Sequence, residues 1–411
     1  MPFIPAIPGN GVGLRLLDTS SGEAEPVGRE GEPFSMYVCG ITPYDATHLG
    51  HAATYVTFDL VNRVMRDAGH HVRYVQNVTD VDDPLFERAD RDGEDFRELA
   101  RREVALFRDD MTALAVLPPD VFAGVEESMP TIVAKVQELV ESGAAYRLPV
   151  DGEDSQDVYL DLSQVDGFSS VSRWSREEML AVFGERGGDP EREGKRDALD
   201  PLLWRGARKD EPTWDGGDLG PGRPGWHIEC TAIALEHLDV PFDLSAGGSD
   251  LVFPHHEMSS SQSAALGAGR EFARHYAHQA MVGYQGEKMS KSKGNLVLVS
   301  RLRAEGVDPM AIRLVLLAHD HRTDWEYTHD QLEQAQERLG RWRTALSGNS
   351  APESEPLLAT VRERLSDDLD SPGALAAMDR WAERSLAGEG DDPTAAGIVA
   401  RTLDALLGVR V

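Results

Sequence analysis

Two histidines separated by two residues stand at the start of a predicted helix, in the segment Thr47-His48-Leu49-Gly50-His51. The N-terminus of a helix presents free backbone N–H groups and the positive end of the helix dipole, so it favours phosphate. A spacing of three residues places His48 and His51 on one face of that helix. The pattern predicts a phosphate site, although histidines at such positions are also common as surface or capping residues.

A glycine-bounded loop later in the chain carries three lysines among small hydroxyl residues. Its sequence is Gly286-Glu287-Lys288-Met289-Ser290-Lys291-Ser292-Lys293-Gly294-Asn295. A cationic loop of this kind can fold over a triphosphate and stabilise the charge that develops as pyrophosphate leaves. Taken alone, the same string is also typical of a solvated basic loop.

Two cysteines and a pair of histidines are candidate metal ligands. Cys39 ends a predicted strand, Cys230 lies on a predicted helix, and His255-His256 follow Phe253-Pro254. Thiolate and imidazole ligands suit zinc. A reducing cytosol would keep the two cysteines, the only ones in the sequence, as thiols. Spacing alone leaves the alternative open that both cysteines are small buried residues and that the histidines lie in the core.

Elements of a parallel α/β fold surround these residues. Residues 34–40 and 71–78 are predicted strands, and residues 48–68 form a predicted helix between them, with apolar side chains on one face. The alternation returns with a helix from Trp226 to Leu238 and a strand from Phe242 to Gly248. Cys39 lies at the end of a predicted strand, the histidine segment opens the next helix, and Cys230 lies on the helix that begins at Trp226.

Two other regions differ from the α/β pattern. Residues 164–225 are rich in Gly, Pro, Asp and Arg, which predicts an irregular insertion with long loops. Past Thr328 the pattern is helical alone, with a linker at residues 347–356, and predicts a small helical bundle.

Bulk composition limits the partners. The chain has 411 residues, of which 41% are hydrophobic, and no run approaches the ~20 consecutive apolar residues of a membrane span. Its start, Met1-Pro2-Phe3-Ile4-Pro5, lacks the features of a secretory signal, so we expect a cytoplasmic protein. The net charge of −30 argues against a partner as polyanionic as tRNA, although such acidity also serves solubility.

The histidine segment and the lysine loop, in this order, resemble the paired HIGH and KMSKS signatures of class I aminoacyl-tRNA synthetases. The resemblance implies a Rossmann-like nucleotide-binding domain in which an amino acid carboxylate attacks the α-phosphate of ATP. It assigns His48, His51, Lys288 and Lys291 to the phosphates, with Mg²⁺ as the counterion of ATP. It also divides the chain into residues 1–115 (first half of the catalytic domain), 116–220 (insertion), 221–327 (second half, with the lysine loop) and 328–411 (helical bundle).

Three further segments look like the zinc-binding segments of cysteinyl-tRNA synthetases: Tyr37–Gly40, Gly225–Cys230 and Phe253–Glu257. This resemblance implies one zinc ion per chain, held by Cys39, Cys230 and His255. A metal that must receive a thiolate rejects a hydroxyl, which separates cysteine from serine. The resemblance also places residues around the cysteinyl adenylate. On the amino acid side they are Cys39, Gly40, Ile41, Thr42, Thr54, Asn77, Val78, Thr79 and Trp226. On the nucleotide side they are Gly248, Ser249, Asp250 and Val282.

The sequence departs from cysteinyl-tRNA synthetases at four places. Ser259 stands where those enzymes have a glutamate that completes the metal shell, which leaves three protein ligands and an open position on zinc. Pro84 replaces a lysine, and residues 185–190 differ from the synthetase insertion. The sequence ends at Val411, so we expect no anticodon-reading region.

These departures resemble the mycothiol ligases, paralogues of cysteinyl-tRNA synthetases. The resemblance implies an ATP-dependent ligase that activates L-cysteine as cysteinyl-AMP. The cysteine is then joined to the amine of glucosaminyl-inositol, giving Cys-GlcN-Ins, AMP and pyrophosphate. We therefore expect small-molecule substrates, no tRNA, no membrane and a monomer. The alternatives are a cysteinyl-tRNA synthetase lacking its anticodon-binding region and a catalytically silent relative that binds or regulates.

Overall fold

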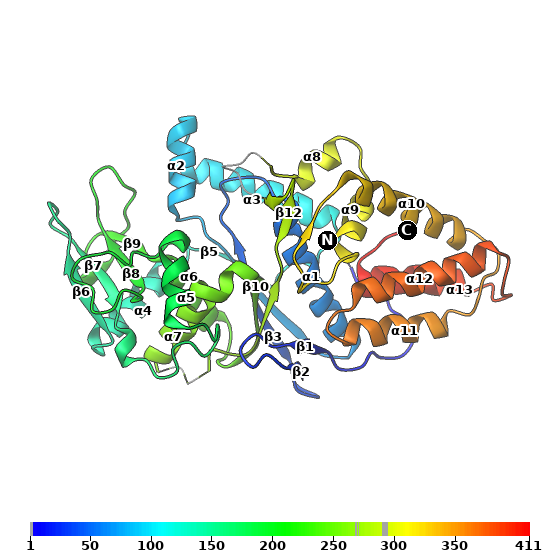
Figure 1. Ribbon diagram of the computed structural model, residues 1–411, viewed down its shortest axis with the longest axis horizontal. Coiled ribbons are helices and arrows are strands. Elements are labelled where there is room, and N and C mark those ends of the chain that lie inside the picture. The colour runs from blue at the N-terminus through cyan, green and yellow to red at the C-terminus, as the bar shows by residue number, and fades with distance from the viewer. Residues whose placement is uncertain (1–2, 268, 270, 290–294) are drawn as a thin grey trace.

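A parallel sheet of five strands forms the centre of the molecule (Figure 1). The computed structural model describes residues 3–267, 269, 271–289 and 295–411. The strands lie in the order β11-β10-β3-β4-β5, and every neighbouring pair is parallel. Their bounds are Phe34–Ile41 (β3), Val72–Val78 (β4), Val121–Gly124 (β5), Phe242–Gly248 (β10) and Ala273–Gln279 (β11).

The chain order in this sheet reverses beside β3. The chain runs outward from β3 through β4 to β5, and then returns to the other side of β3 with β10 and β11. Such a reversal leaves a crevice at the carboxyl ends of the two central strands, where α/β proteins bind ligands. The predicted α/β fold class is confirmed, and the crevice lies between β3 and β10.

Helices cover both faces of the sheet, so the residues of its three central strands, β10, β3 and β4, are nearly all buried. Met36 and Val38 of β3 pack with helices α1, α3 and α9, whereas Tyr37 and Cys39 pack with α4, α6 and α7. The bounds of these helices are Leu49–Asp67 (α1), Phe96–Ala113 (α3), Met129–Glu141 (α4), Trp226–His237 (α6), Glu257–Ala265 (α7) and Pro309–Leu317 (α9).

Four short strands form a second, antiparallel sheet, and two of them, β8 and β9, lie inside the region predicted to be irregular. The expectation for residues 164–225 is therefore wrong where β8 and β9 lie. Glycine is required there by close backbone contact, since a Cβ at Gly206 would come 2.6 Å from the Gln156 carbonyl oxygen and one at Gly222 2.3 Å from that of Arg205. The strands are β6 (Ala145–Pro149), β7 (Gln156–Leu160), β8 (Leu202–Gly206) and β9 (Gly222–Pro224).

The predicted helical bundle is present at the C-terminal end, opposite the antiparallel sheet in Figure 1. Its first long helix follows Thr328, as expected, while the last helix continues into a π-helical turn. With α9, its helices are α10 (His329–Leu346), α11 (Glu355–Ser366), α12 (Ser371–Leu386), α13 (Ala395–Thr402) and the π turn η7 (Leu403–Leu407).

The remaining elements are short or lie at the edges. They are β1 (Arg15–Leu17), β2 (Ala24–Pro26), α2 (Asp83–Asp92), α5 (Arg176–Phe183), β12 (Val282–Tyr284), β13 (Glu287–Lys288), α8 (Val299–Ala304), β14 (Trp325–Glu326) and the short turns η1 (Leu162–Gln164), η2 (Gly184–Arg186), η3 (Gly217–Leu219), η4 (Ser249–Leu251) and η5 (Val252–His256). Among the described residues, no helix is both long and apolar enough to cross a bilayer. The division of the chain at residues 115, 220 and 327 stays a prediction.

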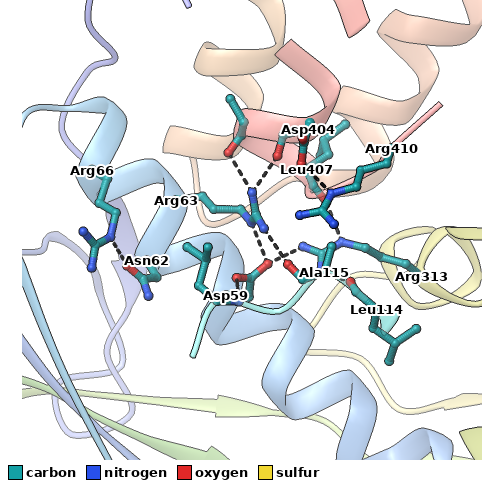
Figure 2. A network of polar contacts seen from close by, with 12 residues as sticks. Asp59, Asn62, Arg63, Arg66, Leu114, Ala115, Arg313, Asp404, Leu407 and Arg410 are labelled. Atoms are coloured by element: carbon teal, nitrogen blue, oxygen red, sulfur yellow. Dashed lines mark hydrogen bonds and ion pairs between the residues drawn. The ribbon is translucent and has the colours of Figure 1, made fainter. Parts of the chain in front are cut away.

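Helix α1 is held between the sheet and the bundle by a buried polar network (Figure 2). Fourteen of its 19 residues are buried, including the charged residues Asp59 and Arg63. Arg63 Nε donates to Asp59 Oδ2 at 2.7 Å, and its NH1 donates to the Asp404 carbonyl at 2.6 Å. Arg313 of α9 bonds the same carboxylate. The helix that begins with the two histidines is therefore fixed to the C-terminal end of the chain.

Candidate active site

A cavity of about 420 Å³ opens where the sheet order reverses. It is lined from β3, from the start of α1, from the start of α6, from the end of β10 and from β12. Eleven residues that the sequence assigns to the site line it: Cys39, Gly40, Ile41, Thr42, His48, His51, Thr54, Trp226, Gly248, Asp250 and Val282. The cavity therefore gathers most of the expected site from five separate segments.

The carboxyl end of β3 lies unusually close to β4 in this cavity. A Cβ on Gly40 would come 1.6 Å from the Asn77 carbonyl oxygen, so only glycine fits. The Gly40 N–H donates to Asn77 Oδ1 at 2.8 Å, and Asn77 Nδ2 donates to Thr79 Oγ1 at 3.0 Å. Asn77 and Thr79 do not line the cavity themselves but brace the strand ends that do.

The two histidines of the first motif lie together at the start of α1. Their rings stack with centroids 3.8 Å apart, as the three-residue spacing predicts. His48 is the N-cap of the helix, and its Nδ1 accepts a hydrogen bond from the Gly50 N–H at 3.0 Å. Because Nδ1 is an acceptor, the neutral ring carries its proton on Nε2. A histidine donor thus stands beside the helix N-terminus, at a place suited to phosphate oxygens.

Cys39, Cys230 and His255 form a compact buried group. One ligand atom from each lies within 4.8 Å of the other two, and no other group of this kind occurs in the described part of the chain. Contact with the Cys39 thiol lowers the pKa of Cys230 well below its ordinary value, against the effect of burial. Two sulfurs and one imidazole fit the ligand preference of zinc.

Glu257 does not belong to this group. Its carboxylate accepts hydrogen bonds from the backbone N–H groups of Ser169, Val171 and Ser172 at 2.7 to 3.1 Å, so it faces the insertion. Ser259 is buried, with its Oγ 3.5 Å from the His227 carbonyl oxygen. Among the described residues, helix α7 therefore provides no carboxylate as a fourth ligand beside Cys39, Cys230 and His255.

A row of buried histidines lies behind the metal-ligand group, and the sequence did not single out His227 or His278. His256 Nε2 lies 3.2 Å from Cys39 Sγ, and His256 Nδ1 lies 2.8 Å from His278 Nε2. His278 Nδ1 in turn contacts Thr19 Oγ1 at 2.7 Å. If Cys39 accepts as a thiolate, each ring must donate toward it and the Thr19 hydroxyl must donate to His278.

His227 lies on the other side of the same group. Its Nδ1 is 3.1 Å from His255 Nδ1. The sequence could have indicated this position, because His227 precedes Cys230 by three residues and so lies on the same face of α6. No pattern in the sequence connects His278, on β11, with the two cysteines. The Tyr55 hydroxyl of α1 donates to the Cys39 carbonyl at 3.3 Å and was likewise missed.

Besides Asn77 and Thr79, two predicted site residues do not line the cavity, and the side chains of two more are not described. Val78 lines a different groove, and Ser249 begins the turn η4 without lining the cavity. The backbone of Lys288 pairs with Gly283 in the β12–β13 ribbon. Lys291 lies outside the described residues.

Acidic side chains stand beside the strand ends. Thr42 Oγ1, in the cavity wall, donates to Asp82 Oδ2 at 3.3 Å, while Asp82 caps helix α2. Burial, with a further contribution from Asp83, raises the pKa of Asp82 to about 6. Burial also raises the pKa of Asp80 to about 6, although the Glu126 N–H donates to its carboxylate.

Known proteins resemble this chain over nearly its whole length. The chain matches the family of class I (C) tRNA synthetase catalytic domains over residues 27–337. It is 58% identical over 411 residues to the L-cysteine:1D-myo-inositol 2-amino-2-deoxy-alpha-D-glucopyranoside ligase of Salinispora tropica, covering 99% of this chain and 100% of that protein. The ligase of the same name from Kytococcus sedentarius is 55% identical over 433 residues, with 99% and 98% covered.

Solved structures share the fold. Methionyl-tRNA synthetase of Mycobacterium tuberculosis, bound by methionyl-adenylate, superposes with a TM-score of 0.65 at 17% identity, covering 92% of each chain. A LeuRS–tRNA–LeuAMS complex from Agrobacterium radiobacter gives 0.66 at 12% identity, covering 93% and 84%. These identities establish the fold alone. The fold, the family match and the full-length relatives show that the chain belongs to the L-cysteine:1D-myo-inositol 2-amino-2-deoxy-alpha-D-glucopyranoside ligases of the class I synthetase family.

Proposed function

We propose that this protein is an ATP-dependent ligase that activates L-cysteine as cysteinyl-AMP and joins it to the amine of glucosaminyl-inositol. The observation that carries the proposal is the buried Cys39–Cys230–His255 group beside a cavity that also holds His48 and His51. A thiol-selecting centre and a phosphate site then serve one substrate pair, cysteine and ATP.

In the first half-reaction a carboxylate oxygen of cysteine attacks the α-phosphorus of ATP, and the bond to the pyrophosphate oxygen breaks. His48 and His51, at the positive end of the α1 dipole, bind the phosphates, together with Lys288 and Lys291 and with Mg²⁺ on ATP. This chemistry depends on placement and charge neutralisation rather than on a protein base.

The end of β3 holds the amino acid part of the adenylate. Gly40, Ile41 and Thr42 lie along it, Thr54 faces it from α1, and Asn77, Val78 and Thr79 support it from β4. Trp226 stands at the thiol side, where its ring centroid is 4.5 Å from that of His255. Gly248, Ser249, Asp250 and Val282 hold the nucleotide part.

The three buried ligands suit one zinc ion per chain, because two sulfurs and an imidazole form a soft donor set. When bound, zinc supplies a ligand position that a thiolate fills and a hydroxyl fills poorly, which separates cysteine from serine. Cys39, Cys230 and His255 would hold the ion, and Ser259, unlike a glutamate, would leave that position open.

In the second half-reaction the ammonium group of the amino sugar first loses a proton. The neutral amine nitrogen then attacks the activated carbonyl carbon, the carbon–oxygen bond to AMP breaks, and the nitrogen releases its second proton. An amide results. The identity of the acceptor is supported by relatives that are more than 50% identical over nearly the whole chain. Their names give 1D-myo-inositol 2-amino-2-deoxy-alpha-D-glucopyranoside, which is glucosaminyl-inositol, as the substrate. We further propose a cytoplasmic monomer that uses no tRNA.

Purified protein supplied with ATP and cysteine, and with either glucosaminyl-inositol or tRNA, tests the proposal. We expect cysteine to appear on the amino sugar, with one AMP and one pyrophosphate released per amide, and none on tRNA. Charging of tRNA alone would identify a cysteinyl-tRNA synthetase instead. Absence of cysteine-dependent pyrophosphate exchange would identify a catalytically silent relative.

A further inference from the structure

A second hollow, of about 550 Å³, lies between helix α3 and the carboxyl ends of β4 and β5. We call it the α3 groove. Val78, Phe122 and Gly124 contribute to its strand side, and Ala105 and Arg101 to its helix side. Its volume falls in the range of small-molecule sites.

The α3 groove and the active-site cavity are neighbours. Ile41 lines the cavity, and its partner in the sheet, Val78, lines the groove. The two residues stand on adjacent strands, which are about 4.8 Å apart in a sheet, and the Thr79 N–H donates to the Ile41 carbonyl at 2.9 Å. A molecule in the groove therefore lies one strand away from the end of β3.

Mixed charge characterises the groove. It is lined by three arginines and four carboxylates: Arg97, Arg101, Arg108, Asp80, Asp109, Glu126 and Glu127. With all of them ionised the groove carries a net charge of about −1, which suits a ligand with one positive charge and disfavours a polyanion. Carboxylates accept from hydroxyl groups and guanidinium groups donate to them, so the set also suits a polyol.

Part of this set is already positioned by the protein. Arg97 and Glu126 form a two-pronged ion pair with N–O distances of 2.5 to 3.0 Å, and Glu126 also accepts from Trp214 Nε1 at 3.2 Å. Asp80 stands at the strand end of the groove beside Val78. Gly124 leaves room for it, because a Cβ there would come 2.8 Å from Asp80 Oδ2.

We propose that the α3 groove binds the amino-sugar acceptor, with Asp80 directing the cationic amine toward the strand ends and the outer charged residues holding the ring hydroxyls. The inference rests on the proposed function and adds to it a place for the second substrate. Cysteine and ATP occupy the cavity on one side of the Ile41–Val78 pair, and the polyol enters from the other.

Two variants test the groove. Ala105→Trp fills it from an exposed position on α3, and Asp80→Asn removes its innermost charge while keeping an oxygen that can accept from Glu126 N–H. We expect the KM for glucosaminyl-inositol to rise at least about tenfold in each, while cysteine-dependent ATP–pyrophosphate exchange, which needs no acceptor, changes less than about twofold. Ala387→Trp, at an exposed site after α12, is the matched control and should change neither.

The outcomes separate the two proposals. An unchanged acceptor KM in Ala105→Trp, with exchange and amide formation intact, would overturn the α3 groove and leave the proposed function standing. Lack of exchange or of amide formation by the unmodified protein would instead overturn the proposed function. If Asp80→Asn fails to fold, calorimetric titration of Ala105→Trp with glucosaminyl-inositol decides alone, because a heat of binding equal to that of the unmodified protein contradicts the groove.

Discussion

Arg313 of helix α9 donates to the carboxylate of Asp59 in the middle of α1, and both side chains are fully buried. Arg63 shares that carboxylate, so two guanidinium groups meet one acid. The excess positive charge faces carbonyl groups at two helix ends, where the helix dipole is negative. These carbonyls belong to Leu114, Ala115, Asp404, Ala405 and Leu407. The network joins the helix that carries His48 to the C-terminal bundle.

Asp59→Asn should destabilise the protein by about 3–5 kcal/mol, because it leaves two buried guanidinium groups without a counter-charge. Urea denaturation measures the loss. Glu305→Gln is the control, because it breaks an exposed ion pair: the Glu305 side chain is 54% exposed and that of its partner Arg301 is 76% exposed. This change should lower the free energy of unfolding by less than about 1 kcal/mol. Equal losses in the two variants would show that the buried network contributes no more than a surface pair.

The same network predicts acid sensitivity. Burial alone would raise the pKa of Asp59, but Arg63 and Arg313 hold it below its ordinary value. A carboxylate with a lowered folded pKa stabilises the fold above its unfolded pKa of about 3.9, and that contribution is lost as the pH falls through the folded pKa. The stability difference between the unmodified protein and Asp59→Asn should therefore shrink below about pH 4. A difference that stays constant there would contradict the assignment.

Asp82→Asn should have the opposite pH dependence. Burial and Asp83 raise the folded pKa of Asp82 to about 6, against Arg223 and Thr42, which lower it. Between its unfolded and folded pKa values the folded protein keeps a proton that the unfolded chain releases, so stability falls as the pH rises. The Tm of the variant relative to the unmodified protein should increase from about pH 4 to about pH 6 and stay level above about pH 7. Asp95→Asn, the same change at the exposed N-cap of α3, is the matched control.

Local patterns in the sequence were sufficient for the strand–helix–strand unit and for the placement of His48 and His51 on one face. Both depend only on periodicity and spacing, and the helical bundle follows from the same signal. The strands of the insertion were missed because they are short and contain Gly206, Gly222 and Pro224, which local signals assign to loops. Tertiary contact rather than local preference forms that sheet.

Long-range contacts explain the other omissions. In the sequence, Asp59 and Arg63 look like ordinary surface residues of a helix. They can be buried only because Arg313 and the carbonyl groups at the end of the last helix pack against them. His278, which contacts His256, lies on strand β11, 22 residues further along the chain. The resemblance to a known family supplied the cysteines and His255 together, which spacing alone left open.

Gly40→Ala should lower the rate of cysteine-dependent pyrophosphate exchange by about 10²-fold or more. A Cβ at this position would come 1.6 Å from the Asn77 carbonyl oxygen, so β3 and β4 must separate at the place proposed for the adenylate. Displacement of reacting groups by about 1 Å can cost about 10²-fold in rate. Gly340→Ala on α10, where nothing lies within 4 Å of the added carbon, is the control and should stabilise the helix by up to about 1 kcal/mol. Exchange that survives Gly40→Ala would show that the two strands can separate without effect on the site.

Cys39→Ser, Cys230→Ser and His255→Gln should each lower the zinc content of the purified protein from about one equivalent per chain, because each removes one of three ligands. Elemental analysis measures the content. His237→Gln, on the same helix as Cys230 but outside the group, should keep the metal. Ser259→Glu should close the open position and raise the KM for cysteine. An unchanged KM in a folded variant would count against an open site.

His48→Asn separates the two roles of the first histidine. The asparagine oxygen can replace Nδ1 as the acceptor for the Gly50 N–H, so the helix cap and the stability should be kept within about 0.5 kcal/mol. The Nε2 donor proposed for the phosphates is lost, so pyrophosphate exchange should fall by about 10²-fold, the usual effect of removing one such donor. His48→Ala should lose the same rate and about 1 kcal/mol of stability in addition. If His48→Asn retains full exchange, the histidine serves only as a cap, and the phosphate site does not depend on it.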